Sequence, residues 1–187
     1  MAFKDKFKTF QSLQTGTDIV LRQVNPETDL SAYFDIYSDA GAFIYYEGYG
    51  NAPDMEHVKI ILHNQIRDFE KARMYCWTIA DSKTETVMGR IHLSDFENGN
   101  SCANIGYFLG REYWGKGVIS ICIAPVIRFG FDFLELERIC TRVEVNNIAS
   151  WKALEKNGFL REGTLRRTFQ LSIGLHDCYI YAKLSTD

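Results

Sequence analysis

The chain has 187 residues, of which 46% are hydrophobic and 24% are charged, and its formal net charge is -3. This length suits one domain that buries its own core, and the mild negative charge argues against nucleic-acid binding, which normally needs a basic face. The chain has no apolar run of about 18 residues, which excludes a membrane span, and its five scattered cysteines favour reduced thiols in the cytoplasm. We expect a single domain over residues 1–187, with residues 1–17 as an N-terminal extension.

The first half of the chain predicts a strand, two helices and a meander. Alternation of apolar and polar residues predicts a strand over residues 19–24, and a helical pattern follows as far as Tyr37. After a loop over residues 41–51, Pro53-Asp54 begins a second helix that extends to about Phe69. Strand-like runs cover residues 74–80, 87–93 and 102–109, with turn-forming segments at 81–83 and 98–100. Because the connections are short, these three strands should be antiparallel.

The second half predicts alternating helices and strands that end in a hairpin. An apolar helix is expected over residues 118–133, a strand over 138–145, and a helix over 149–157 that Gly158 closes. Residues 159–184 alternate again around the turn Ile173-Gly174. The elements together predict an α+β fold with a mixed, mainly antiparallel central sheet and flanking helices.

A glycine-rich turn lies between the expected strand 102–109 and the next helix. Its sequence, Gly110-Arg-Glu-Tyr-Trp-Gly-Lys-Gly117, offers backbone N–H groups and a helix N-terminus to an anion such as a phosphate. It differs from a P-loop because Gly117 replaces the Ser or Thr that holds magnesium, and from a dinucleotide fingerprint because Ser120 replaces the third glycine. A tight turn that needs glycine for positive φ is the other interpretation.

A second group of motifs follows about thirty residues later and identifies a resemblance. The ordered combination resembles the GNAT superfamily of N-acetyltransferases, and within it the Rim-type branch of RimJ/RimL-like ribosomal-protein alanine and serine N-acetyltransferases. Its parts are Ile105-Gly-Tyr-Phe-Leu109, Tyr113-Trp-Gly-Lys-Gly117, Asn147-x-x-Ser150, Glu155-Lys156-x-Gly158-Phe159 and Arg161-Glu-Gly163.

The resemblance implies where acetyl-CoA binds. In the GNAT fold the fourth and fifth strands, here residues 102–109 and 138–145, are parallel and splay apart, and the pantetheine arm lies in the gap. The turn amides would meet the pyrophosphate, and no metal is implied. The expected cofactor-binding residues are Phe108, Leu109, Tyr113, Trp114, Gly115, Lys116, Gly117, Val118, Ile119, Asn147 and Ser150. Helix capping by Asn147 and Ser150, and a solvated Lys116, are the structural alternatives.

Catalytic roles are expected for Ser150 and Glu47. Many relatives place a proton-donating tyrosine where this chain has Leu154, so Ser150 is left to protonate the departing thiolate. The positions at which relatives place a glutamate base hold Asn104 and Arg142, neither of which is acidic. The remaining bases are Glu47, Glu144, His92, Asp95 or a water relay, and Glu47 is favoured because its aromatic loop, residues 45–49, borders the acceptor site in this fold.

The missing carboxylates favour one class of acceptor. An α-amine, with a pKa near 7.7 to 8.0, costs about 1 kcal/mol to deprotonate at neutral pH, whereas a lysine costs about 4 to 5 kcal/mol. We therefore expect a peptide N-terminus, a small amine or an amino-acid-like amine as the acceptor. No nucleic-acid or membrane partner is expected, and a second copy of the chain, in a homodimer, is among the partners considered. A non-catalytic acyl-CoA sensor is the first alternative, and a P-loop-like nucleotide hydrolase is the second.

Overall fold

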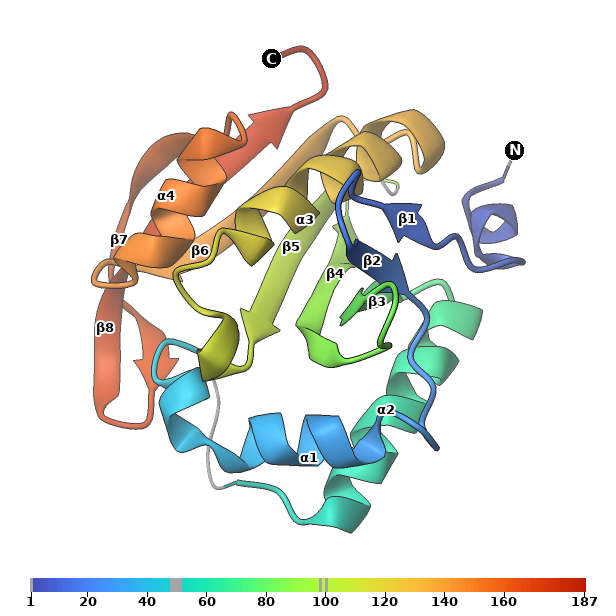
Figure 1. The fold of residues 1–187 in the computed structure, drawn as a ribbon. Coiled ribbons are helices and arrows are strands. Elements are labelled where there is room, and N and C mark those ends of the chain that lie inside the picture. Colours follow the sequence, from blue (N-terminus) through green and yellow to red (C-terminus); the bar gives the residue numbers. More distant parts are fainter. Residues whose placement is uncertain (1, 48–51, 98, 100) are drawn as a thin grey trace.

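The computed structural model describes residues 2–47, 52–97, 99 and 101–187. Within them an eight-stranded sheet runs in the order β1-β2-β3-β4-β5-β6-β8-β7 (Figure 1). All neighbouring strands are antiparallel except β5 and β6, which are parallel. The strands are β1 (Leu13–Gln14), β2 (Ile19–Arg22), β3 (Met74–Asp81), β4 (Val87–Glu97), β5 (Cys102–Leu109), β6 (Arg138–Glu144), β7 (Leu160–Leu171) and β8 (Gly174–Leu184). The predicted α+β fold with a mixed, mainly antiparallel sheet is confirmed.

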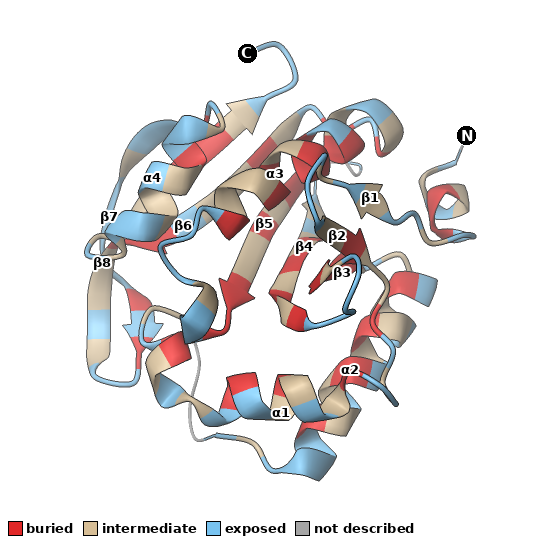
Figure 2. Cartoon of the chain, viewed as in Figure 1, coloured by how far each residue is buried: buried red, intermediate tan, exposed pale blue. Residues whose placement is uncertain are grey.

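Helices cover both faces of the sheet. Those of the α class are α1 (Leu30–Ser38), α2 (Met55–Glu70), α3 (Val118–Arg128) and α4 (Ile148–Lys156). Figure 1 shows α3 and α4 on one face, with α1 and α2 along the other. Two apolar clusters fill the space between the layers: one contains Ile91, Leu93 and Cys122, and the other contains Tyr33 and Leu62. Buried residues accordingly lie on the sides of the helices that face the strands (Figure 2).

The burial of β3 and β4 follows from this layering. β3 is buried almost throughout because helices cover both of its faces, whereas β4 alternates along its length. Ile91 and Leu93 of β4 enter the first cluster. The alternate residues Arg90, His92 and Ser94 therefore project to the opposite face, and this places three polar side chains on the side of α1 and α2.

Helix boundaries follow local signals, and one helix changes type along its length. Asp54 caps α2 by accepting a hydrogen bond from the His57 N–H at 2.8 Å, and Gly158 ends α4 with φ +80°. The predicted helix over residues 118–133 is present, but its type changes near the end: α3 ends at Arg128 and a π-helical turn follows over Phe129–Phe133. The apolar pattern continues through that turn, so hydrophobic spacing did not mark the change of helix type.

The N-terminal residues belong to the folded layers. A 3₁₀ helix over Phe3–Phe7 packs Phe7 against Phe69 and Tyr75, and β1 pairs with β2. The sequence had indicated only an extension here. Two expected segments, the turn at residues 98–100 and the loop over residues 41–51, lie partly outside the described residues.

Candidate active site

The sheet opens between its two parallel strands. β5 and β6 pair only over Cys102–Asn104 and Arg138–Cys140, and beyond these three pairs β6 is bonded to β8 alone. Residues 105–109 of β5 remain paired with β4 on their other side. The C-terminal halves of β5 and β6 therefore diverge, as the predicted splay requires, and leave backbone edges facing one another across a gap.

The glycine-rich turn lies at the end of β5, before α3. Gly115 and Gly117 have φ values of +70° and +76°, and a Cβ at either position would contact nothing within 4 Å. Backbone conformation, not crowding, therefore requires glycine at both positions. The first intrahelical bond is donated by Ile121 to the Gly117 carbonyl, so the preceding amides have no intrahelical acceptor. These amides, together with the helix N-terminus, suit an anionic group.

The neighbouring residues of the turn have different environments. Lys116 is exposed, with its Nζ 5.8 Å from the Tyr113 ring centroid, and the Trp114 indole donates to the Leu109 carbonyl at 3.1 Å. Phe108 and Leu109 are buried in opposite clusters, so they can offer a ligand only backbone atoms. Val118 is buried and Ile119 is half-buried at the start of α3.

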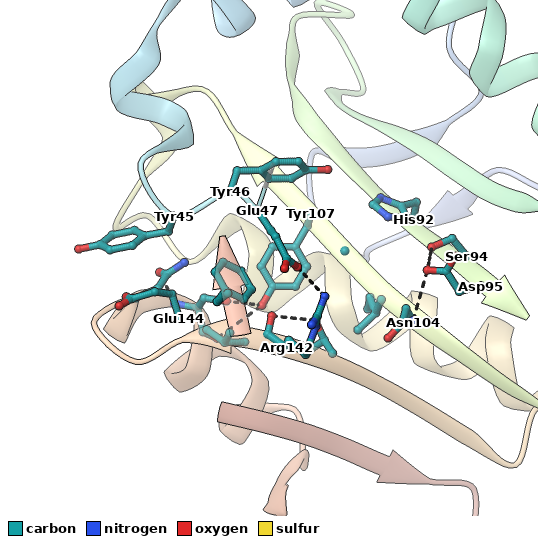
Figure 3. Close-up of a pocket in the computed structure, with 17 residues that line it drawn as sticks. Tyr45, Tyr46, Glu47, His92, Ser94, Asp95, Asn104, Tyr107, Arg142 and Glu144 are labelled. Carbon is teal, nitrogen blue, oxygen red and sulfur yellow. Dashed lines mark hydrogen bonds and ion pairs between the residues drawn. The ribbon is translucent and has the colours of Figure 1, made fainter. Parts of the chain in front are cut away.

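A pocket of about 300 Å³ occupies the gap between the diverging strands. It is lined from β4, β5, β6, the start of α4 and the loop after α1, and β7 adds Phe169 (Figure 3). The predicted residues that it brings together are Glu47, His92, Asp95, Glu144, Asn147 and Ser150. The turn residues 113–119, and Phe108 and Leu109, do not line it.

Ser150 shares a hydrogen bond with a residue that sequence reasoning missed. Its Oγ lies 2.8 Å from the hydroxyl of Tyr107, which reaches across the gap from β5 to α4. Burial raises the pKa of Tyr107 well above its ordinary value, so the phenol keeps its proton. Asn147 caps α4 and accepts the Ser150 N–H at 3.3 Å. The capping role considered for Asn147 is therefore present, and the Ser150 hydroxyl remains directed at Tyr107.

Glu47 forms an ion pair in the pocket. Its carboxylate lies 2.7 Å from the guanidinium of Arg142 on β6, and both side chains are partly exposed (Figure 3). This ion pair joins the loop after α1 to β6 across the pocket. A proton-accepting role for Glu47 requires that an incoming molecule loosen the pair.

The other two carboxylates in the pocket also have partners. Glu144 is 1% exposed and accepts hydrogen bonds from the Asn146 backbone and side chain, at 2.7 and 2.9 Å, while its Oε1 lies 3.2 Å from Nδ1 of His176. Asp95 accepts from the Ser94 hydroxyl at 3.0 Å and from the Asn104 amide at 3.2 Å. These contacts hold both carboxylates to neighbouring polar groups.

Within the described residues, no helix is long and apolar enough to cross a membrane. Among the same residues, no group of three or more His, Cys, Asp and Glu side chains is arranged to hold a metal ion.

Comparison with known proteins supplies the family context for this pocket. The model of the acetyltransferase (GNAT) domain matches residues 18–160. The chain is 30% identical to the uncharacterized N-acetyltransferase YoaA of Bacillus subtilis over 92% of the chain and 96% of YoaA. It is 35% identical to the uncharacterized N-acetyltransferase p20 of Bacillus licheniformis over 59% of the chain, and 30% identical to the ribosomal-protein-serine acetyltransferase of Escherichia coli over 54%. The matched regions span 62% and 57% of those two proteins.

Among solved structures, the fold is similar to that of RimL, a ribosomal L7/L12 alpha-N-protein acetyltransferase in complex with coenzyme A. The TM-score is 0.83 at 19% identity, and the match covers 93% of this chain and 98% of RimL.

Proposed function

The chain belongs to the GNAT family of acetyl-CoA-dependent N-acetyltransferases, and from that membership we propose that it acetylates a primary amine by direct attack on acetyl-CoA. The preferred acceptor is a peptide or protein N-terminal α-amine, and the second class is a small, amino-acid-like amine. The observation that carries the proposal is the pocket between diverging parallel strands, which has Ser150 and Tyr107 on one side and the loop after α1 on the other.

The residues present fit the cofactor. The positive φ angles of Gly115 and Gly117 leave the turn amides beside the N-terminus of α3, where a pyrophosphate would be held, with Lys116 as a nearby cation. The unpaired edge of β5 beyond Asn104 offers backbone groups to an extended amide arm. When bound, acetyl-CoA supplies the thioester carbonyl that the amine attacks.

Ser150 is proposed to donate a hydrogen bond or a proton to the departing thiolate. Its hydroxyl is held 2.8 Å from the protonated phenol of Tyr107, so the pair can pass a proton toward the sulfur. Tyr107 thereby takes a place in the proposed site, although Leu154 stands where many relatives place a tyrosine. The oxyanion that forms on the carbonyl would be stabilised by a backbone N–H near Phe108.

Glu47 is proposed as the base on the acceptor side. The carboxylate is partly exposed at the pocket, and binding of an amine would compete with Arg142 for it. A weak base of this kind suits an α-amine, which needs only about 1 kcal/mol to lose its proton at neutral pH. The E. coli relative, named a ribosomal-protein-serine acetyltransferase, supports a protein acceptor.

A cytoplasmic location is part of the proposal. Among the described residues, which include all five cysteines, no disulfide forms, and this suits a reducing compartment.

The test is release of free thiol from acetyl-CoA with a panel of acceptors. Peptides with a free N-terminal amine should release thiol fastest, small amines and amino acids should follow, and peptides whose only amine is a lysine side chain should be slowest. The product of the first class should carry the acetyl group on its N-terminal nitrogen, as mass spectrometry would show. Tight binding of coenzyme A with no thiol release from any acceptor would contradict the enzyme proposal and favour the sensor.

A further inference from the structure

We propose that His92 contacts the acceptor amine and orients it for attack by accepting a hydrogen bond from one of its N–H groups. The inference rests on the proposed acetyl transfer. It assigns a substrate contact to β4, a strand that carries neither Ser150 nor Glu47.

The position of His92 is set by a glycine on the neighbouring strand. His92 pairs directly with Gly106 of β5, and a Cβ on Gly106 would lie 2.5 Å from Cε1 and 2.7 Å from Nε2 of the imidazole. The Cε1–Nε2 edge of the ring therefore lies over the space that a side chain would otherwise occupy. This edge is directed toward the gap, and Figure 3 shows the imidazole among the groups that line the pocket.

The ring and the Ser150–Tyr107 pair lie on opposite faces of β5. Gly106 and Tyr107 are consecutive strand residues, so their side-chain directions point to opposite faces. The Gly106 face carries His92, and the Tyr107 face carries the hydroxyl that meets Ser150. The amine adds to one face of the planar thioester carbon while the sulfur lies in its plane, so the nucleophile and the leaving group need separate polar contacts. The pocket supplies one polar contact for each, on either side of a single strand.

Hydrogen-bond partners distinguish His92 from the carboxylates around it. Glu47 is paired with Arg142, Asp95 with Ser94 and Asn104, and Glu144 with Asn146 and His176. By contrast, Nδ1 of His92 is buried and has no hydrogen-bond partner among the described residues. A buried polar group without a partner is costly and uncommon in folded proteins. When Nδ1 carries the proton of the neutral ring, Nε2, on the edge that faces the gap, is the nitrogen that can accept a hydrogen bond.

The charge state of His92 suits an amine that must stay neutral. Burial, with a smaller contribution from the charge of Arg90, lowers the pKa of His92 to about 3. A carboxylate at this place would favour the ammonium form of the acceptor, which cannot attack, whereas a neutral imidazole favours it less. In the reaction the amine nitrogen forms the C–N bond, the C–S bond breaks, the nitrogen loses one proton and the thiolate gains one. His92 therefore orients the amine and stores no proton.

The experiment measures steady-state kinetics of His92→Ala with acetyl-CoA and a peptide acceptor. The kcat/KM for the acceptor should fall at least about tenfold, while the KM for acetyl-CoA should stay within about twofold. Added imidazole should restore part of the lost rate, because the variant leaves a ring-sized space in which no Cβ of Gly106 intrudes. His92→Gln, whose amide oxygen can accept the same hydrogen bond, should retain more activity than His92→Ala. His63→Ala, at an exposed histidine on α2, is the matched control. Its kcat/KM for the acceptor should equal that of the wild type, and added imidazole should not change it.

A second variant tests the orientation of the ring without removing it. Gly106→Ala places a methyl group against the imidazole and should slow acceptor turnover, with little further loss in the double variant Gly106→Ala/His92→Ala. Unchanged acceptor kcat/KM in His92→Ala would overturn the inference. Loss of activity that imidazole does not restore and that raises the KM for acetyl-CoA to the same degree would also overturn it. A wild-type chain that releases no thiol with any acceptor would instead refute the proposed function.

Discussion

The low pKa of His92 makes a quantitative prediction about stability in mild acid. The ordinary pKa of histidine, 6.5, applies to the unfolded chain, and burial lowers the pKa to about 3 in the folded one. Between these two values the unfolded chain binds the proton and the folded chain does not. The contribution of the neutral His92 to the free energy of unfolding is therefore fully present above the unfolded pKa, and it is lost as the pH drops from about 6.5 toward 3.

The size of the effect follows from the distance between the pH and the unfolded pKa. At about pH 5 the unfolded ring is protonated by a margin of about 1.5 pH units, each worth about 1.4 kcal/mol, while the folded ring remains neutral. His92 should thus lower the free energy of unfolding by about 2 kcal/mol between about pH 7.5 and pH 5. Against the typical 5 to 15 kcal/mol of a folded domain, this is a readily measured loss.

The assay is urea unfolding of the wild type and of His92→Gln at both pH values. Each protein is compared with itself, so a change in the overall stability of the variant cancels. The wild type should lose about 2 kcal/mol more than His92→Gln on acidification. His63→Gln, which removes an exposed histidine, should lose as much as the wild type. Equal losses in the wild type and in His92→Gln would refute the claim that the ring is held neutral by burial.

Two further predictions concern the proposed catalytic groups. Ser150→Ala and Tyr107→Phe each break the 2.8 Å hydrogen bond and should slow turnover at least about tenfold with little change in coenzyme A affinity. The double variant should be less impaired than the product of the two single effects, because both residues take part in one hydrogen bond. Strictly multiplicative effects would contradict the pair, and unchanged turnover in Ser150→Ala would refute its role. Glu47→Gln should lower kcat at least about tenfold without changing the KM for acetyl-CoA. Glu85→Gln is the control, because this exposed glutamate pairs with Arg22 outside the pocket, and it should leave kcat unchanged. A Glu47→Gln enzyme of wild-type rate would show that the ion pair with Arg142 is only structural.

Strand positions were largely predictable because local patterns encode them. β5 was predicted with its observed bounds, 102–109, since an apolar run lies there between a turn and the glycine-rich segment. β4 was predicted too short, because three of its last four residues are polar and include Asp95 with its positive φ (+52°), where the register with β5 shifts. Such an irregularity depends on pairing with another strand, and a single segment carries no signal for it.

The pocket was predictable in part, and for different reasons. Ser150 and Asn147 could be placed by motif, but the contact of Ser150 with Tyr107 joins residues 43 positions apart. The Glu47–Arg142 ion pair spans 95 positions and depends on how the loop after α1 crosses the sheet. The pairing of His92 with Gly106 could have been derived from the register of the β4–β5 hairpin, because a glycine opposite a bulky residue indicates room for its ring.

The divergence of β5 and β6 also bears on how the protein avoids self-association. Unpaired strand edges usually invite other polypeptides to add on, and proteins protect them with charges, bulges or covering segments. Here two such edges face one another inside the molecule, between α4 on one side and the loop after α1 on the other. Two strands at the centre of the sheet can therefore remain unpaired along part of their length, protected by these covering segments, and their edges stay available to an extended ligand.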